Sequence, residues 1–483
     1  MMTIQLLLAG EATAAEHEAT FTRTNPLSGE VVTTAAAASA GDAQRAADVA
    51  SQAFDVWSQT GPGERRAKLL KAAELMEARQ GDFIDRMVEE TGATVGWAGF
   101  NVKVAADVLR EAAALTTQIQ GDIIPSNVPD SMAMGVRTPC GVVVGIAPWN
   151  APIILGTRAL ATPLACGNSV ILKASEQCPA THHLIGEVLQ EAGFGDGIVN
   201  VITNAPDNAA EVVGALIAHP AVRRINFTGS TGVGKIIAEQ ASRYLKPVLL
   251  ELGGKAPLLV LEDADIEAAV DAAIFGAFFN QGQICMSTER VVVDHRIADA
   301  FVDKFAARAQ ALKAGNPRDE RNTLGTLINA QSGEKLNSLL NDAVSKGARV
   351  AAGGKAEGVV MQATVVDGVT RDMRLYSEES FGPVVAVMRV SGDEEAIRIA
   401  NDSEYGLSSA VFSRDSARAM KVARRLQTGI CHINAPTVHD EPQMPFGGTK
   451  SSGYGRFGGK AGIEEFTELR WMTMQLGPRH YPI

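Results

Sequence analysis

The spacing of apolar side chains predicts helices over most of residues 41–116. Ala-rich segments such as AGDAQRAADVASQAF and GERRAKLLKAAELMEA place an apolar residue every three or four positions, which is typical of amphipathic helices. A short apolar run at residues 4–8 predicts a first strand ahead of them. The segment 120–141 then mixes prolines, glycines and polar alternation, which predicts extended strands in a protruding hairpin.

Strands and helices alternate from residue 142 onward. The apolar stretches VVVGIAP, SVILK, IVNVIT, RRINFTG and PVLLELGG are separated by helix-patterned segments. Such strands predict a buried parallel sheet, which binds ligands at the carboxyl ends of its strands. After residue 254 the alternation restarts with PLLVLEDAD and ERVVVD and predicts a second α/β domain. Its helices are expected at 266–279, 296–313, 331–346 and 394–401, and the tail FTELRWMTMQL is expected to be a strand.

The composition of the 483 residues argues against several classes of protein. A net charge of −11 argues against a nucleic-acid or anionic-membrane surface. No apolar stretch approaches the roughly 18 residues of a membrane span, and the N-terminus lacks the basic region of a signal peptide. The eight histidines form no ligand cluster, so no metal is expected. Five scattered cysteines without a CxxC pair suggest neither a zinc ribbon nor a disulfide framework, and they predict a reducing, cytoplasmic location.

Two glycine motifs look like nucleotide-binding signatures but depart from them. GSTGVGKI at 229–236 follows a strand and opens a helix, yet Ile236 stands where a P-loop nucleotidase needs Ser or Thr to reach Mg²⁺. The same segment can still hold a dinucleotide phosphate at a helix N-terminus, and a plain turn is the alternative. GYGRFG at 453–458 has no strand before it and no βαβ unit after it, so we interpret it as a loop.

Three polar residues stand in settings that suit catalysis. Cys285 lies in NQGQICMSTER, a polar, glycine-containing turn, and a reactive cysteine needs partner groups placed by the fold. Glu251 is an acid inside the apolar stretch LLELGGK, and a buried ion pair is the alternative to a catalytic role. Asn150 ends the strand IAPWN, and a helix N-cap before Pro152 is its alternative.

The chain resembles the NAD(P)-dependent aldehyde dehydrogenase superfamily over nearly its whole length. The matching stretches, in order, are IAPWN (146–150), LKASE (172–176), NFTGSTGVG (226–234), LELGGK (250–255), NQGQICMSTER (280–290), EESFGP (378–383), NDSEYGLS (401–408) and PFGGTKSSGYGR (445–456). The resemblance implies oxidation of an aldehyde to the acid through a thiohemiacetal and a thioester. Cys285 would be the nucleophile, Glu251 the general base and Asn150 the oxyanion donor. The other cysteines match no catalytic motif and are expected to be structural: Cys140, Cys166, Cys178 and Cys431.

The resemblance also implies NAD as the cofactor. Lys173 and Glu176 would face the adenosine ribose, where a carboxylate accepts bonds from hydroxyls but repels the 2′-phosphate of NADP. The pyrophosphate would lie at Gly229 and Ser230, and the nicotinamide ribose near Glu379. The full set expected to bind the cofactor is Ile146, Trp149, Lys173, Glu176, Gly229, Ser230, Gly234, Leu252, Glu379 and Phe381.

The implied fold is α/β and has three parts. A Rossmann-like cofactor domain would comprise residues 1–119 and 140–252, and an α/β catalytic domain residues 253–450. A small β oligomerisation segment would comprise residues 120–139 and 466–483, which implies a homodimer or homotetramer. The sequence departs from the family where Phe457 follows Arg456, a position that commonly holds Glu, and a local packing change is expected there.

The segment PWNAPIILGTRALATPLACGN and the stretch GQICMSTER look most like the aromatic-aldehyde branch, the salicylaldehyde, vanillin and benzaldehyde dehydrogenases. Ala151 stands where the family commonly has a bulky group, which leaves room for a ring. Arg158 would meet a ring hydroxyl or form a structural ion pair. Alternatives are a broad-specificity aliphatic enzyme, a CoA-acylating member and a non-enzymatic structural member. The expected substrate pocket consists of Trp97, Ala151, Leu155, Arg158, Phe279, Ile284, Met286 and Phe446.

Overall fold

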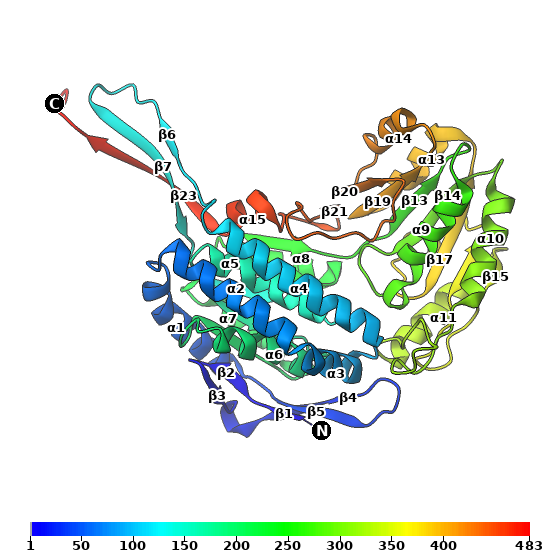
Figure 1. The fold of residues 1–483 in the computed structure, drawn as a ribbon, viewed down its shortest axis with the longest axis horizontal. Coiled ribbons are helices and arrows are strands. Elements are labelled where there is room, and N and C mark those ends of the chain that lie inside the picture. The colour runs from blue at the N-terminus through cyan, green and yellow to red at the C-terminus, as the bar shows by residue number, and fades with distance from the viewer. Residues whose placement is uncertain (1) are drawn as a thin grey trace.

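Two mainly parallel sheets organise residues 2–483, the part of the chain that the computed structural model describes (Figure 1). The first sheet has eight strands in the order β22-β12-β11-β8-β9-β10-β2-β3. Its central strands run parallel and are largely buried, as their apolar sequences predict. They are β8 (Val142–Ile146), β9 (Ser169–Lys173), β10 (Val199–Ile202), β11 (Val222–Thr228) and β12 (Val248–Glu251).

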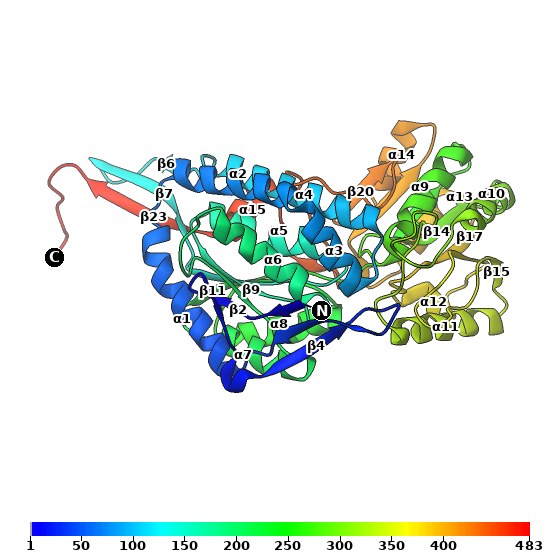
Figure 2. The same ribbon diagram turned by 60° about the horizontal axis from the view of Figure 1, so that its bottom comes forward.

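Helices cover both faces of this sheet (Figure 2). Val143 of β8 enters the core beneath α2, α4, α5 and α6, whereas Val142 and Val144 enter the core beneath α1, α7 and α8. Successive strand residues point to opposite faces, so one apolar strand supplies both cores. The helices predicted over 41–116 are confirmed as α1 to α4. The bounds are α1 (Ala40–Trp57), α2 (Pro62–Ala78), α3 (Gln80–Thr91), α4 (Val95–Leu115), α5 (Pro152–Ala165), α6 (Pro179–Glu191), α7 (Ala209–Ala218) and α8 (Thr231–Ser242).

The single strand predicted at residues 4–8 is wrong, because the chain changes sheets at Gln5. β1 (Met2–Ile4) pairs with β5 (Val31–Ala36), which also pairs with β4 (Thr20–Thr24). β2 (Leu6–Leu8) instead joins the first sheet between β10 and β3 (Glu11–Thr13). All three leucines of β2 are buried, which a strand with only one covered face would not achieve.

The second sheet has seven strands in the order β15-β16-β17-β14-β13-β19-β20 and confirms the predicted second α/β unit. All neighbours in it are parallel except β15 and β16. Its strands are β13 (Ala256–Val260), β14 (Thr288–Asp294), β15 (Arg349–Ala352), β16 (Thr364–Asp367), β17 (Val384–Val390), β19 (Ser408–Phe412) and β20 (Ile430–Ile433). Its helices are α9 (Ile266–Phe278), α10 (Ala298–Ala311), α11 (Ala330–Ser345), α12 (Arg374–Ser377), α13 (Gly392–Asn401) and α14 (Ser416–Ala423).

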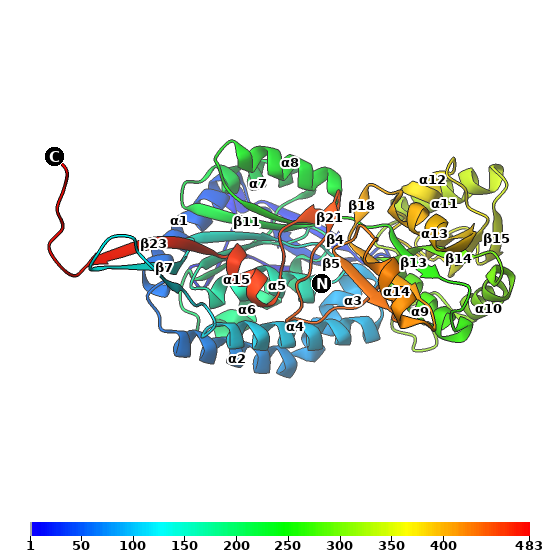
Figure 3. The ribbon, with the colours of Figure 1, turned by 90° about the horizontal axis from the view of Figure 1, so that it is seen from above.

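A three-stranded antiparallel arm projects from the first unit (Figures 1 and 3). It consists of β6 (Asp122–Ile124), β7 (Ser131–Pro139) and β23 (Thr467–Gln475), in the order β23-β7-β6. The arm confirms the hairpin predicted at 120–141 and the strand predicted in the tail. No helix within residues 2–483 has the length and apolar character needed to cross a membrane.

The segment 453–458, interpreted above as a loop, in fact begins with a strand. β22 (Gly453–Tyr454) pairs antiparallel with the end of β12, with Gly453 opposite Glu251. A Cβ at Gly453 would lie 2.0 Å from the Leu250 carbonyl oxygen, so this close pairing requires glycine. After β22 the chain forms α15 (Gly459–Glu465), and Phe457 between them is buried against Phe466.

Candidate active site

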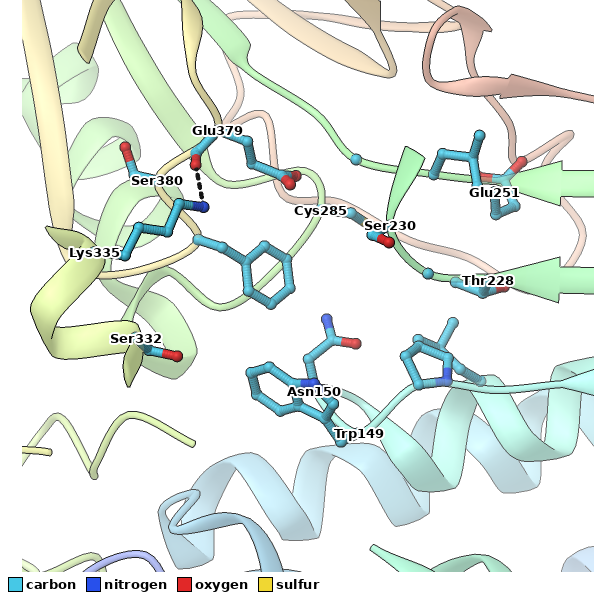
Figure 4. A pocket seen from close by; sticks show the side chains of 16 residues that line it. Trp149, Asn150, Thr228, Ser230, Glu251, Cys285, Ser332, Lys335, Glu379 and Ser380 are labelled. Atoms are coloured by element: carbon cyan, nitrogen blue, oxygen red, sulfur yellow. Dashed lines mark hydrogen bonds between the residues drawn. The ribbon is translucent and has the colours of Figure 1, made fainter. Parts of the chain in front are cut away.

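The three predicted catalytic residues line one cavity of about 280 Å³ (Figure 4). Asn150 follows β8, and Glu251 ends β12, so both come from carboxyl ends of the first sheet. Cys285 follows α9 in the second unit. The cavity therefore lies where loops of the two units meet, at the sheet edge where parallel α/β folds bind ligands.

The turn before Cys285 has an unusual backbone that explains its polar sequence. Asn280, Gln281 and Gly282 all adopt positive φ, at 47°, 54° and 68°. Nε2 atoms of Gln281 and Gln283 donate to the Thr326 carbonyl over 3.1 and 3.3 Å. The amide side chains thus hold a strained turn in place, and such strain is concentrated at functional sites.

The Asn150 side chain is also fixed by this turn. Its Nδ2 donates to the Gln283 backbone carbonyl over 2.9 Å, and the backbone carbonyl of Asn150 accepts from Trp97 Nε1 at 2.9 Å and from Asn280 Nδ2 at 3.0 Å. The N-cap alternative is wrong, because Ala151 occupies the N-cap of α5. The side-chain amide is therefore held at the cavity wall. One of its two N–H groups donates to Gln283, and the other remains available to a ligand.

Glu251 is a buried acid that forms no ion pair within residues 2–483. Its side chain is 3% exposed, and neither carboxylate oxygen has a hydrogen-bond partner within residues 2–483. Burial raises its pKa well above the usual range, and the charges of Arg158 and Arg456 offset this only in part. The ion-pair alternative is therefore wrong, and the group has the raised pKa of a candidate general base.

Cys285 is half-buried in the same cavity. Burial raises the pKa of its thiol to about 12, and the negative charges of Glu251 and Glu379 add to this effect. Both groups therefore hold their protons more tightly than they would in water. Glu251 lines the same cavity, so the acid and the thiol share one site.

Six of the predicted cofactor residues line the cavity beside Cys285. Trp149 meets Phe381 edge-on, with ring centroids 5.6 Å apart. The Gly254 N–H donates to Oε1 of Glu379 over 2.7 Å, and burial beside Glu289 raises the pKa of Glu379 to about 7. Four of the six come from the first unit and two from the second: Trp149, Gly229, Ser230, Leu252, Glu379 and Phe381.

Phe381 belongs to a loop that is held by Glu289. This contact was not predicted from the sequence. Glu289 accepts hydrogen bonds from the backbone N–H groups of Ser380, at 2.7 Å, and Phe381, at 3.0 Å, and pairs with Lys255 at 2.6 Å. Phe381 has a positive φ of 53°, which costs energy unless its surroundings fix it. Glu289 lies in the stretch NQGQICMSTER, but its partners are distant in the sequence, so its role could not be predicted from the local pattern.

The other predicted cofactor residues lie outside this cavity, around the ends of β8 and β9 and on α8. Lys173 pairs with Glu176, which also accepts from Asn204 Nδ2 at 3.0 Å, and Ile146 is opposite Lys173 in the sheet. A Cβ at Gly234 would meet Leu252 at 2.4 Å, so glycine lets α8 approach β12 closely. The set therefore extends from the cavity along the carboxyl edge of the sheet.

The predicted substrate residues divide between the cavity and its surroundings. Leu155 lines the cavity, whereas Ala151, Ile284 and Met286 are buried nearby in the apolar cluster against which Cys285 packs. Trp97, Phe279 and Phe446 belong to or pack against the same cluster, and the Trp97 and Phe279 rings meet edge-on at 4.8 Å.

Arg158 forms the ion pair that was its structural alternative. It pairs with Asp440, and its guanidinium lies 4.7 Å from the centroid of the Phe446 ring. Several cavity residues were missed from the sequence, because single residues scattered over loops and the ends of helices and strands give no periodic signal. They are Pro148, Thr228, Gly253, Ser332, Lys335 and Ser380.

Comparison with known proteins places the whole chain in one family. Residues 13–472 match the Aldehyde dehydrogenase family. A vanillin dehydrogenase of Pseudomonas fluorescens is 61% identical over 483 residues, which are 100% of both chains. A salicylaldehyde dehydrogenase of Pseudomonas putida is 52% identical over 464 residues, 96% of each chain. The crystal structure of a salicylaldehyde dehydrogenase from Pseudomonas putida G7 complexed with salicylaldehyde matches with a TM-score of 0.98 and 50% identity over 100% of both chains. The chain therefore belongs to the aldehyde dehydrogenase family.

Proposed function

We propose that this aldehyde dehydrogenase oxidises aromatic aldehydes to carboxylic acids, with NAD as the electron acceptor. The single observation that carries the proposal is the convergence of Cys285, Asn150 and Glu251 on one cavity at the carboxyl edge of the first sheet. The vanillin and salicylaldehyde dehydrogenases, which match the chain over 100% and 96% of their own length, support the aromatic substrate class.

The proposed chemistry begins at the Cys285 sulfur. The thiol loses its proton to water, and the resulting thiolate forms a bond to the aldehyde carbon. The carbonyl oxygen becomes an oxyanion, which the Asn150 side-chain N–H and the Cys285 backbone N–H stabilise. The nicotinamide cofactor, when bound, supplies the hydride acceptor for oxidation to the thioester. Glu251 then takes a proton from water, the water oxygen attacks the thioester carbon, and the C–S bond breaks to release the acid.

The residues along the sheet edge fit a dinucleotide. Gly229 and Ser230 precede the N-terminus of α8, where backbone N–H groups attract phosphate. Two apolar side chains of α8, Val233 and Ile236, are 46% and 55% exposed and offer a surface to a flat adenine ring. Glu176, fixed by Lys173 and Asn204, would receive the adenosine ribose and favour NAD over NADP.

The apolar surroundings of Cys285 support a ring-bearing substrate. Leu155 lines the cavity, and Trp97, Phe279 and Phe446 lie in or against the cluster beside Cys285. Burial of one aromatic ring contributes roughly 2–3 kcal/mol, which is about a thirtyfold to hundredfold advantage if it persists in the transition state.

The proposed enzyme has three parts in each subunit. The cofactor domain would comprise 1–119 and 140–252, the catalytic domain 253–450, and the arm segments 120–139 and 466–483. We infer that the arm joins subunits in a homodimer or homotetramer, because β23 exposes large apolar side chains in the single chain. All five cysteines are free thiols, which supports a reducing compartment such as the cytoplasm.

A substrate panel tests the proposed function. We expect kcat/KM for benzaldehyde and its hydroxylated derivatives to exceed that for acetaldehyde and betaine aldehyde by at least thirtyfold. A higher kcat/KM for either aliphatic aldehyde would contradict the aromatic assignment and would leave the family assignment intact.

A further inference from the structure

Asp440 has a buried carboxylate oxygen that the protein leaves unused. One oxygen, Oδ2, pairs with Arg158. The other, Oδ1, is buried and has no hydrogen-bond partner within residues 2–483. The Arg158 and Asp440 side chains are only 7% and 14% exposed. A buried acceptor without a donor is costly, so an unpaired one in a native structure needs an explanation.

The position of Asp440 relates this oxygen to the reacting cysteine. Its partner Arg158 lies over the ring of Phe446, which belongs to the apolar cluster against which Cys285 packs. The charges of Arg158 and Asp440 are close enough to Cys285 to shift its pKa, downward and upward respectively. Asp440 is therefore near the place where the ring of a bound aldehyde would lie.

Asp440 also lines a second cavity, of about 290 Å³, which has room for a ring substituent. His432, Met444 and Phe446 line the same cavity. His432 Nε2 is a second buried polar atom without a partner in the described chain, and burial with the nearby His439 lowers the His432 pKa. Apolar walls with a few polar groups are typical of small-molecule sites.

We propose that Asp440 is a specificity-determining residue, whose Oδ1 accepts a hydrogen bond from a ring hydroxyl of the aromatic aldehyde. The inference rests on the proposed function. Arg158 holds Oδ2, so the carboxylate is fixed and Oδ1 remains free to accept. A carboxylate oxygen only accepts, so it distinguishes a phenolic O–H from a methoxy group of similar size. Because Arg158 already neutralises Asp440, the favoured substrate is a neutral phenol.

The test compares hydroxybenzaldehydes with methoxybenzaldehydes of the same ring position, with benzaldehyde as the unsubstituted reference. For at least one ring position, we expect the wild-type kcat/KM for the hydroxyl compound to exceed that for the methoxy compound by about tenfold or more, as for a hydrogen bond to a charged group. Asp440→Asn should lower this ratio about tenfold, because its oxygen turns to Arg158 and its NH₂ faces the substituent. Asp440→Glu, which keeps a carboxylate, should retain a ratio above one.

Asp319→Asn is the matched control, because it neutralises an aspartate in an exposed pair with Arg321. It should leave the ratio unchanged. The ratio is measured within one preparation, so a smaller folded fraction cancels. An unchanged hydroxyl-to-methoxy ratio in Asp440→Asn, or an equal loss of kcat/KM toward all three aldehydes, would overturn the inference. Oxidation of benzaldehyde by the wild type would still uphold the proposed function. Failure of the wild type to oxidise benzaldehyde would instead refute the proposed function.

Discussion

At the scale of single residues, Glu251 carries the clearest electrostatic signature of the site. Its burial raises the folded-state pKa well above the unfolded value. The folded state therefore binds a proton more tightly, and the resulting stability is present below the unfolded pKa and lost as pH rises through the folded one. Glu251→Gln cannot ionise, so its melting temperature relative to wild type should increase as pH rises from about 5 to about 9. A difference that stays constant with pH would contradict the raised pKa.

Glu176 carries a second prediction at this scale. Its carboxylate, paired with Lys173 and bonded by Asn204, would repel a 2′-phosphate. We expect kcat/KM to be higher with NAD than with NADP. Glu176→Gln should reduce this difference, mainly by raising kcat/KM with NADP. Steady-state kinetics with both cofactors measure this. Equal values in the wild type would refute the role of Glu176.

At the scale of elements, Glu289 of β14 positions the loop that bears Glu379 and Phe381. Glu289→Gln should remove the charge that pairs with buried Lys255 and should cost about 3 kcal/mol in the free energy of unfolding. It should also raise KM for NAD more than it lowers kcat. Glu378→Gln is the matched control, because its partner Arg374 is 41% exposed and such surface pairs contribute at most about 1 kcal/mol. Equal effects of both changes would refute the positioning role.

Elements with strong apolar patterns could be predicted, and short or non-local ones could not. The central strands and the long helices follow the spacing of their buried side chains. The change of sheets at Gln5 and the pairing of Gly453 with Glu251 depend on distant partners, so local pattern gave no sign of them. Likewise, the sequence predicted Cys285, Glu251 and Asn150 from their settings and the family resemblance. It could not predict that Asp440 lies beside Arg158, 282 positions away.

At the scale of the whole molecule, the arm exposes more apolar surface than a separate chain would favour. Leu469, Trp471 and Met474 of β23 are 61%, 79% and 54% exposed. We expect Trp471→Ser to weaken the homo-oligomer and shift the mass measured by light scattering toward the monomer. Leu245→Ser is the control, since Leu245 is 92% exposed but lies outside the arm. Retention of the wild-type mass by Trp471→Ser, or a monomeric wild type, would contradict the proposed role of the arm.

The central claim is covalent catalysis on aromatic aldehydes by Cys285, with Glu251 completing the hydrolysis. It is tested most directly by intact-mass and peptide mass spectrometry of Glu251→Gln, quenched after mixing with NAD and benzaldehyde. We predict one benzoyl group per chain, located on the peptide that contains Cys285, together with a burst of NADH and slow turnover. Cys285→Ser should bind NAD but show neither the adduct nor more than about 1% of the activity. NADH formation without an acyl group on Cys285 would contradict the account.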